Sequence, residues 1–238
     1  MSESSSFACL RTAALTRGLD DGAVSELVAA TQTVRIQDGG TLFVQDDPAA
    51  NLYLLHDGRI KISQLTPTGD QIVMRYLGSG DMFGCMVLSG MLSYPATANA
   101  IGDCSVLRWS KKVMGELLEE HPLLATNTLT TVGIRMRELQ ERLGELANER
   151  VEQRIARTVL RLVVQAGERA EDGIRIGFPI LRQDIADMTG TTLHTVSRTM
   201  SSWESHGLAK LGRRRVTVTD MDGVAYIGGG DNISPQAA

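Results

Sequence analysis

A short run of polar residues near the C-terminal end of the chain has the types and spacing needed to read base pairs. The segment from Leu181 to Glu204 has the sequence LRQDIADMTGTTLHTVSRTMSSWE. It predicts two short helices separated by a tight turn at Gly190, because glycine tolerates the positive φ at which a helix stops and the chain bends. Thr192 is placed to cap the second helix through its hydroxyl. Arg198 on that helix can donate two hydrogen bonds to guanine O6 and N7, which predicts recognition of a DNA major groove.

Apolar residues on the two predicted helices are spaced to face each other across the bend. Ile185 and Ala186 precede the turn, and Val196 and Met200 follow it. Ala186 is small enough to let two helices cross closely, as in a helix-turn-helix. Any two amphipathic helices joined by a glycine share this pattern, so further features are needed to establish DNA binding.

A basic hairpin is predicted directly after the second helix. In the segment GLAKLGRRRVTVTD, Gly207 ends the helix and two alternating segments flank a turn at Gly212. This hairpin is rich in Lys and Arg, although the whole chain has a formal net charge of −4. Positive charge concentrated there suits the phosphates of double-stranded DNA. The candidate DNA contacts are Thr192, His194, Thr195, Ser197, Arg198, Lys210, Arg213, Arg214 and Arg215.

The composition predicts a cytoplasmic protein. The chain has 238 residues, of which 42% are hydrophobic, enough for one large or two modest domains. No apolar run approaches the ~20 residues that cross a bilayer, and the N-terminus lacks the basic and apolar regions of a signal peptide. The three cysteines, Cys9, Cys85 and Cys104, are odd in number and widely spaced, which fits a reducing compartment rather than a disulfide framework.

The N-terminal half predicts a β-roll. A short helix is expected over residues 20–31, since Val24, Leu27 and Val28 share one face. From residue 32 to residue 109, short β-rich segments recur between glycine-rich turns, and the run LYLLHDGRIKISQL predicts a hairpin about Asp57-Gly58. Strands at such regular spacing indicate a barrel or jelly roll. The expected fold class is therefore α+β.

A helical period replaces the strands after Lys111. Pro122 can open a long helix, because its missing N–H costs nothing in a first turn. Apolar residues then fall at alternating steps of four and three, a heptad seam that predicts a homodimer. A helix lying on its own domain can show the same stripe. The seam comprises Ala125, Leu129, Val132, Met136, Leu139, Leu143 and Leu146. Charged residues are expected to cover the other faces, namely Arg135, Arg137, Glu138, Glu141, Arg142 and Glu145.

The order of these parts resembles the cyclic-AMP receptor protein and fumarate-nitrate regulator (Crp/Fnr) family of bacterial transcription factors. The resemblance is carried by GSGDMFG, YPATANA, VEQRIARTVLRL, and RQDIADMTG followed by TVSR. It implies an N-terminal β-roll sensor domain over residues 19–120, a dimerisation helix over 121–148 and a C-terminal winged helix-turn-helix over 149–226. The tail, 227–238, is expected to be disordered. The resemblance also implies a homodimer on an inverted repeat in DNA, with its two reading helices roughly 34 Å apart, and RNA polymerase as a partner.

One candidate DNA contact departs from the family pattern. Ser197 and Arg198 match positions that the fumarate-nitrate branch uses. That branch has a glutamate where this chain has His194, and the glutamate accepts from a base amino group. Since histidine can donate or accept, the operator is expected to differ from the family's usual half-site at that base pair. Lys210 and the arginines from 213 to 215 would hold phosphates without sequence preference.

Cyclic AMP is not the expected signal. In the cyclic-nucleotide receptors of this family, a glutamate shortly after Phe-Gly of the roll binds ribose, and an arginine followed by serine or threonine neutralises the cyclic phosphate. Here Cys85 follows Phe-Gly, and Tyr94-Pro95 takes the place of the arginine and serine. A buried phosphate without a cation is strongly penalised, and proline removes an amide donor. An iron–sulfur cluster is also disfavoured, because only Cys9 lies near the N-terminus.

Haem and thiol chemistry remain open as signals. YPATANA looks like the variant in the dissimilatory nitrate respiration branch, where gas binding to haem is implicated, and His56, His121, Cys85 or a methionine could ligate iron. Each also has a structural interpretation: His56 at a hairpin tip, His121 capping the helix hinge, and Cys85 as a small buried apolar group. The candidate effector residues are therefore His56, Cys85 and Tyr94.

A regulatory module that acts through protein contacts without binding DNA is the main alternative function. It would explain the roll and the long helix but would leave TVSR and the basic hairpin without a role. A metal-dependent jelly-roll enzyme would need clustered histidines, and the roll has only His56. A hydrolase would need a nucleophile with a base and an orienting group, and nothing in the chain sets these apart. We therefore do not expect an enzyme.

Overall fold

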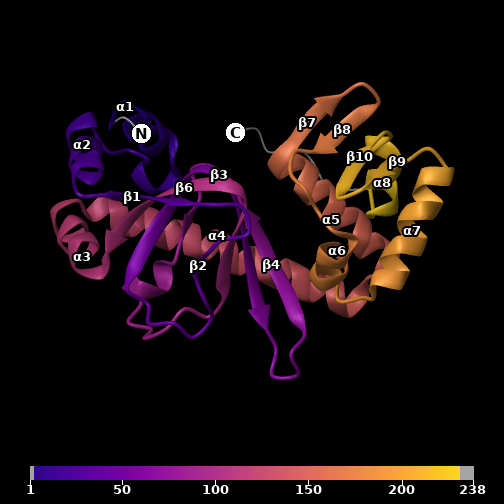
Figure 1. Cartoon of the computed structure of the whole chain (residues 1–238), viewed down its shortest axis with the longest axis horizontal. Coiled ribbons are helices and arrows are strands. Elements are labelled where there is room, and N and C mark those ends of the chain that lie inside the picture. Colours follow the sequence, from indigo (N-terminus) through magenta and orange to yellow (C-terminus); the bar gives the residue numbers. More distant parts are fainter. Residues whose placement is uncertain (1–2, 231–238) are drawn as a thin grey trace. The chain divides into compact units, whose positions relative to one another are not determined.

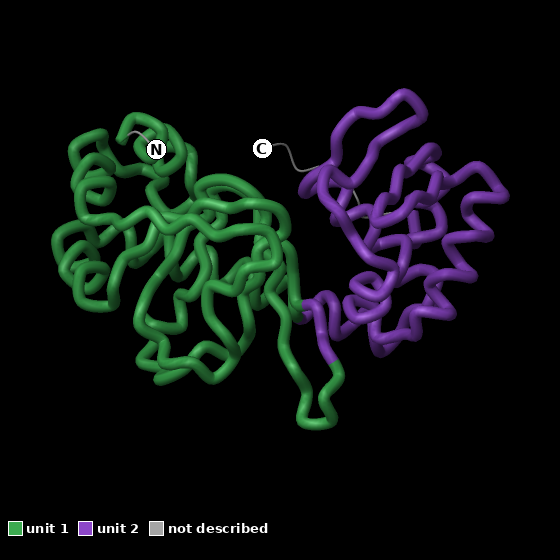
Figure 2. The backbone as a smooth tube through the Cα atoms, viewed as in Figure 1, with its two compact units in different colours: residues 1–70, 74–139 green, residues 71–73, 140–238 purple. Residues whose placement is uncertain are grey.

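The chain divides into two compact units, each with its own helices and sheet. The computed structural model describes residues 3–230. The first unit comprises residues 1–70 and 74–139, and the second comprises residues 71–73 and 140–238 (Figure 2). No helix in this described range is long and apolar enough to span a membrane. The two units are described in turn.

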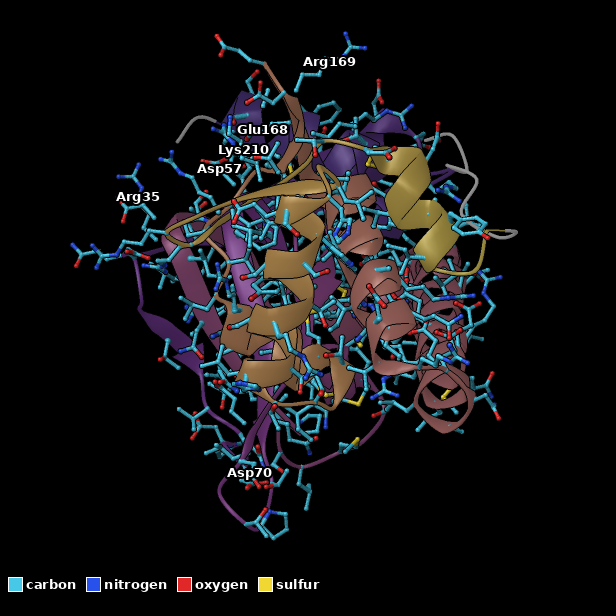
Figure 3. The ribbon with its side chains drawn as sticks, turned by 90° about the vertical axis from the view of Figure 1, so that its right-hand side faces the viewer. Arg35, Asp57, Asp70, Glu168, Arg169 and Lys210 are labelled. Atoms are coloured by element: carbon cyan, nitrogen blue, oxygen red, sulfur yellow. The ribbon has the colours of Figure 1, made fainter. Side chains whose placement is uncertain are left out.

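The first unit is built on an antiparallel β-roll, which confirms the expected fold class. Its strands run in the order β1-β6-β3-β4, with β2 also paired to β6 and β5 to β3. The strands are β1 (Gln32–Ile36), β2 (Thr41–Phe43), β3 (Asn51–Leu65), β4 (Gln71–Leu77), β5 (Met82–Phe83) and β6 (Thr97–Ser110). A loop over residues 66–70 joins β3 to β4, and Asp70 is labelled in it in Figure 3.

The hairpin predicted about Asp57-Gly58 is wrong. Both halves of that segment belong to the single strand β3, which pairs with β6 from Asn51 to Ser63. The turn signal instead marks an irregularity in the ladder, where the register shifts on both sides of Asp57. Gly58 has a φ of 96°, and a Cβ there would lie 2.6 Å from the Cys104 sulfur. Glycine at this position allows β3 to approach β6 closely, and the two strands stay paired on both sides of the irregularity.

Helices gather at one side of the roll and share a core with it (Figure 1). They are α1 (Glu3–Thr12), a 3-10 turn over Ala14–Thr16, α2 (Asp21–Ala29) and α3 (Lys111–Glu120). Asp20 caps α2 by accepting from the Ala23 N–H at 2.9 Å. The Trp109 indole donates to the Leu27 carbonyl at 3.0 Å, and this pins α2 to β6. Helix α1 was not expected from the sequence, yet its Leu10 is fully buried.

The long helix α4 spans Pro122–Asn148, as the sequence predicts. Most of its seam is exposed on the single chain: Leu129 72%, Met136 56%, Leu139 40%, Leu143 66% and Leu146 46%. Val132 is the exception, because it packs against the helical core of the first unit. The seam therefore presents apolar surface that the described chain itself does not cover.

The charged residues of α4 do not all face solvent, contrary to expectation. In the first unit, Arg135 donates to the Met82 carbonyl, and Glu138 lies 3.7 Å from Arg75. In the second unit, Glu145 is only 8% exposed and pairs with Arg161 at 2.5 Å. A long charged side chain can reach a partner on its own unit and be buried by it. The helix is thus anchored by its charges as well as by apolar contacts.

The second unit places helices around a small antiparallel sheet with the strand order β7-β8-β10-β9. The helices are α5 (Val151–Ala166), α6 (Arg182–Thr189), α7 (Leu193–Ser205) and α8 (Met221–Ile227). The strands are β7 (Gly167–Ala170), β8 (Gly173–Ile176), β9 (Ala209–Gly212) and β10 (Arg215–Val218). Residues Ile155, Val159, Leu160 and Val163 of α5 are buried, as their spacing predicts.

Two details of this unit differ from the sequence interpretation. The basic hairpin turns at Arg213-Arg214 rather than at Gly212, because Arg215 pairs directly with Gly212 and a two-residue loop remains. Such a loop needs a positive φ, which Arg214 adopts at 59°. Residues 227–230, which were expected to belong to a disordered tail, are ordered, since Ile227 ends α8 and the Gly230 N–H donates to the Ala225 carbonyl. Residues 231–238 of that expected tail lie outside the described residues.

Candidate nucleic-acid interface and sensor unit

Helices α6 and α7 meet at the tight turn that the sequence predicts. Gly190 adopts a left-handed conformation with φ 59° and ψ 43°. Thr192 caps α7, because its hydroxyl oxygen accepts from the Thr195 N–H at 3.2 Å. The facing residues Ile185, Ala186, Val196 and Met200 are all 0% exposed. The two helices thus form a rigid pair with a buried inner side.

The outer side of α7 carries the polar residues that the sequence singled out. His194 and Arg198 are exposed, and Thr195 and Ser197 are half-buried. Within residues 3–230, the Arg198 side chain has no hydrogen-bond or ion-pair partner. Its guanidinium is therefore available to an external acceptor in the plane of a base.

The inner side of α7 is fastened to α5. Trp203 is 1% exposed, and its indole N–H donates to Glu152 at 2.9 Å. The preceding helix is held in the same way, since the Arg154 side chain donates to the Thr189 carbonyl at 3.0 Å. These contacts fix the orientation of the outer side of α7 within this unit.

The basic hairpin divides its cations into two kinds. Arg213, Arg214 and Arg215 are exposed around the turn. Lys210 instead pairs with Asp172 at 2.5 Å, and the hydrogen bond to this carboxylate raises the pKa of Lys210. Lys210 and Glu168 are labelled on the sheet of this unit in Figure 3. Among the residues that the structure describes, three of the four predicted phosphate contacts have no acidic partner.

A second basic element, absent from the sequence interpretation, lies beside this turn. Arg175 of β8 pairs with Glu168 at 2.7 Å. It lines a cavity of about 330 Å³ together with residues 176–179 and the arginines of the hairpin turn. Strands β7 and β8 have only four residues each, which is too short for an alternating pattern to be recognised.

In the first unit, His56 lies inside strand β3 and not at a hairpin tip. Its Nε2 is 3.0 Å from the Ser5 hydroxyl and its Nδ1 is 3.1 Å from the Ser105 hydroxyl, so both ring nitrogens are occupied. It lines an open cleft of about 1260 Å³. The lining residues are Ser5, Cys9, Arg35, Ile36, Gln37, Gly40, Thr41, His56, Asp57, Asp103, Cys104 and Ser105.

This cleft does not fit haem. A haem pocket needs a free axial ligand and a largely apolar lining, as ligand sites generally have. Both nitrogens of His56 are hydrogen-bonded, and the lining is polar apart from Ile36, Gly40 and the two thiols. The second candidate ligand, Cys85, is 7% exposed within the helical core, and the third, His121, pairs with Glu26 at 2.7 Å. The three candidates do not converge on one site.

Tyr94 belongs to a cluster of stacked aromatic rings. Tyr94 lies 3.9 Å from Phe43 between ring centroids, and Tyr53 stacks on both Phe43 and Phe83. The Tyr94 hydroxyl donates to the Asn51 carbonyl at 2.8 Å. Burial, followed by the proximity of Tyr94, raises the pKa of Tyr53 to about 12. Tyr94 is thus a core residue, with its polar atom satisfied.

Two thiols of the first unit, Cys9 and Cys104, are held in surroundings that favour the neutral form. Burial raises the pKa of Cys9 and of Cys104. Cys104 lies 3.0 Å from the Arg59 carbonyl, to which its thiol donates. Because the thiolate is the reactive form, these surroundings do not suit a redox sensor.

Two arginines of the first unit, Arg75 and Arg135, were not predicted from the sequence to be buried charged groups. Arg135 of α4 is largely buried against the roll, and burial and then the nearby Arg75 lower its pKa. The Nε of Arg75 is buried without a hydrogen-bond partner among the described residues. The sequence signal would have been a charged residue three positions after Val132, about one turn further along the same side of α4.

Comparisons with known proteins agree with this arrangement. The family model of the cyclic nucleotide-binding domain matches residues 33–121, and that of the Crp-like helix-turn-helix domain matches residues 153–226. The chain is 30% identical over 203 residues to the nitrogen fixation regulation protein FixK of Bradyrhizobium diazoefficiens, across 83% of this chain and 82% of that protein. It is 22% identical over 216 residues to a CRP-like cAMP-activated global transcriptional regulator of Mycobacterium tuberculosis, across 91% and 96%.

Solved structures show the same fold. A CRP-family transcriptional regulator of Thermus thermophilus superposes with a TM-score of 0.73 at 25% identity, across 85% of this chain and 99% of that chain. FixK2 of Bradyrhizobium japonicum superposes with a TM-score of 0.72 at 21% identity, across 83% and 96%.

Proposed function

This chain belongs to the Crp/Fnr family of DNA-binding transcription regulators, and on that premise we propose that it binds an inverted repeat in double-stranded DNA as a homodimer. In this proposal, α7 of each chain enters a major groove. Two copies related by a twofold axis place these helices in successive grooves, roughly 34 Å apart, which requires an inverted repeat. The same premise extends the proposal to RNA polymerase as a partner.

The observation that carries the proposal is the exposed, unpaired Arg198 guanidinium on a helix whose opposite side is fixed by Trp203. A guanidinium in this position can bind guanine O6 and N7 together, which is worth ~1–3 kcal/mol against the wrong base. Ser197 would contact a neighbouring base. His194 is exposed on the same helix and would read the base pair at which the family has glutamate.

The basic turn would supply affinity without sequence preference. Arg213, Arg214 and Arg215 are exposed, and their charge attracts the phosphate backbone. Thr192 and Thr195 at the start of α7 offer hydroxyl groups to the same backbone. Lys210 would have to exchange Asp172 for a phosphate before contributing.

The exposed seam of α4 supports self-association. Leu129, Met136, Leu139 and Leu143 are between 40% and 72% exposed, an apolar stripe that a second copy would cover. A module that acts through protein contacts alone would also use this seam, but it would not need the free Arg198 or the three arginines of the basic turn. We therefore favour the DNA-binding function.

We also infer that the signal is not cyclic AMP. Tyr94 stands where the cyclic-nucleotide receptors of the family have an arginine, and it is 3% exposed and stacked on Phe43. The arginine that would neutralise the phosphate is therefore missing at this position, and proline follows it in the chain. Haem also fits poorly at His56, because both of its ring nitrogens are hydrogen-bonded.

Two matched variants test the reading of bases. Selection of binding sequences from a random DNA library gives the half-site, and competition binding then gives the preference for it. Arg198→Ala is expected to remove the preference at one base pair, by ~1–3 kcal/mol, with dimerisation intact. Arg213→Ala is expected to weaken binding to all sequences about equally. An unchanged preference in Arg198→Ala would overturn the assignment of α7 as the reading helix.

A further inference from the structure

Three metal-ligating side chains converge on the surface of the first unit, away from the roll interior. Glu26 lies on α2, Glu120 ends α3, and His121 is the residue directly after α3. One ligand atom from each of the three lies within 4.8 Å of the others. The function proposed above uses none of these residues.

The backbone around the three side chains is well fixed. The His121 N–H donates to the Leu117 carbonyl at 2.9 Å, and the His121 carbonyl accepts from the Leu124 N–H at 2.9 Å. Pro122 follows directly and restricts the chain further. On the other side, Leu27 beside Glu26 accepts the Trp109 indole bond at 3.0 Å. Preorganised ligands lose little freedom when they bind an ion.

The pair of Glu26 and His121 explains only part of the cluster. His121 Nε2 lies 2.7 Å from Glu26 Oε2, and the His121 side chain is only 19% exposed. Glu120 adds a second carboxylate that this hydrogen bond does not satisfy. Glu119 precedes Glu120 at this exposed end of α3, whereas Lys112 pairs with Glu116 one turn earlier in the helix. The field at the cluster therefore attracts a cation.

We propose that Glu26, Glu120 and His121 bind a divalent transition-metal ion, with zinc as the preferred ion among those commonly available. One imidazole and two carboxylates form a mixed nitrogen and oxygen donor set, which suits zinc and its first-row neighbours and disfavours calcium and magnesium. Three protein ligands leave at least one position for water. In binding, His121 ligates as the neutral imidazole, so a protonated ring first releases its proton to solvent.

The location of the site gives the ion a structural role. His121 separates α3 from α4, so an ion held by Glu26 joins α2 to the residue that precedes the seam helix. Binding stabilises this junction of the first unit, because the ion binds the folded state only.

The test measures zinc binding to the full-length protein by calorimetry and thermal unfolding at neutral pH. Glu120→Gln removes one ligand but keeps the hydrogen bond between Glu26 and His121, so it separates metal binding from the structural pair. Glu119→Gln is the matched control, because it removes the same charge from an exposed neighbour that has no place in the cluster. A His121→Gln variant removes the nitrogen ligand.

We expect one zinc ion per chain and a rise in Tm on zinc addition in the wild type and in Glu119→Gln. In Glu120→Gln, the affinity should fall about tenfold or more, and in His121→Gln it should fall further. Equal zinc affinity in Glu120→Gln and Glu119→Gln would overturn the proposal, as would zinc located at the cysteines by anomalous scattering. If zinc affinity fell only in His121→Gln and not in Glu120→Gln, the three-residue site would likewise be overturned.

Discussion

A hydrogen bond between Trp203 of α7 and Glu152 of α5 fixes the orientation of α7 within the second unit. The indole N–H of the buried Trp203 donates to Glu152 Oε1 at 2.9 Å, and Glu152 lies in the first turn of α5. Glu152→Ala leaves this buried donor unpaired and is expected to destabilise the second unit by about 1–3 kcal/mol. Glu152→Gln keeps an acceptor and should lose less. Urea denaturation followed by circular dichroism measures both, and equal losses would show that the hydrogen bond contributes little.

The seam of α4 predicts a change in assembly. Leu139→Glu places a charge in an apolar contact between copies and should convert dimers to monomers, with weaker operator binding. Thr130→Glu puts the same charge on another exposed face of the helix and should remain dimeric. Sedimentation velocity distinguishes the two. A stable Leu139→Glu dimer would mean that the chains associate through another surface.

The aromatic cluster predicts a loss of stability at alkaline pH. Burial raises the pKa of Tyr53 from 10.0 to about 12, so the folded state keeps the proton that the unfolded state loses. The contribution is fully present below pH ~10 and is lost as the pH rises to ~12, by about 2–3 kcal/mol. Tyr53→Phe should remove this part of the decline. The free energy of unfolding, measured from pH 8 to pH 12, would contradict this if the two curves stayed parallel.

The cysteine environments predict slow thiol chemistry. Burial raises the pKa of Cys9 and Cys104, which keeps both as thiols at neutral pH. Iodoacetamide should alkylate Cys104 in the native protein about tenfold or more slowly than in the unfolded protein. Mass spectrometry of timed digests gives the rate at each cysteine. A fast native reaction at Cys104 would restore thiol sensing as a candidate signal.

The replacement of the phosphate-binding arginine by Tyr94 predicts the absence of cyclic AMP binding. Tyr94 is buried and stacked, so a phosphate placed there would lack the cation that the family's arginine provides. Equilibrium dialysis should detect no complex at about 1 mM cyclic AMP. The mycobacterial relative, named as cAMP-activated, provides the positive control. Saturable binding by this chain would refute the inference about its signal.

The sequence predicted most reliably those elements whose signals are local. The glycine at position 190 and the cap at Thr192 act within one turn of helix, and the apolar seam of α4 repeats a spacing of three or four residues; the structure has all three. Helix α1 was missed because it has few apolar residues, and its stability comes from burying Leu10 in a distant core. The false hairpin at Gly58 arose because a turn and a strand irregularity require the same residue type.

The candidate sites divide in the same way. The polar residues of α7 could be placed on one face from spacing alone, because a helix fixes its own geometry. The effector candidates could not be placed, since His56, Cys85 and Tyr94 depend on long-range pairing of strands. Their partners, Ser105, the helical core and Phe43, lie far from them in the sequence.

The pairing of Lys210 with Asp172 determines how many ions DNA binding should release. The ions released on binding come from the DNA phosphates that the protein neutralises. If Lys210 left Asp172 for a phosphate, Asp172 would take up a cation in its place, so the net release would not increase. Three free arginines in each chain, six in a dimer, then set the slope of log affinity against log salt at about −5. The hairpin thus limits the sensitivity of the regulator to the ionic strength of the cell.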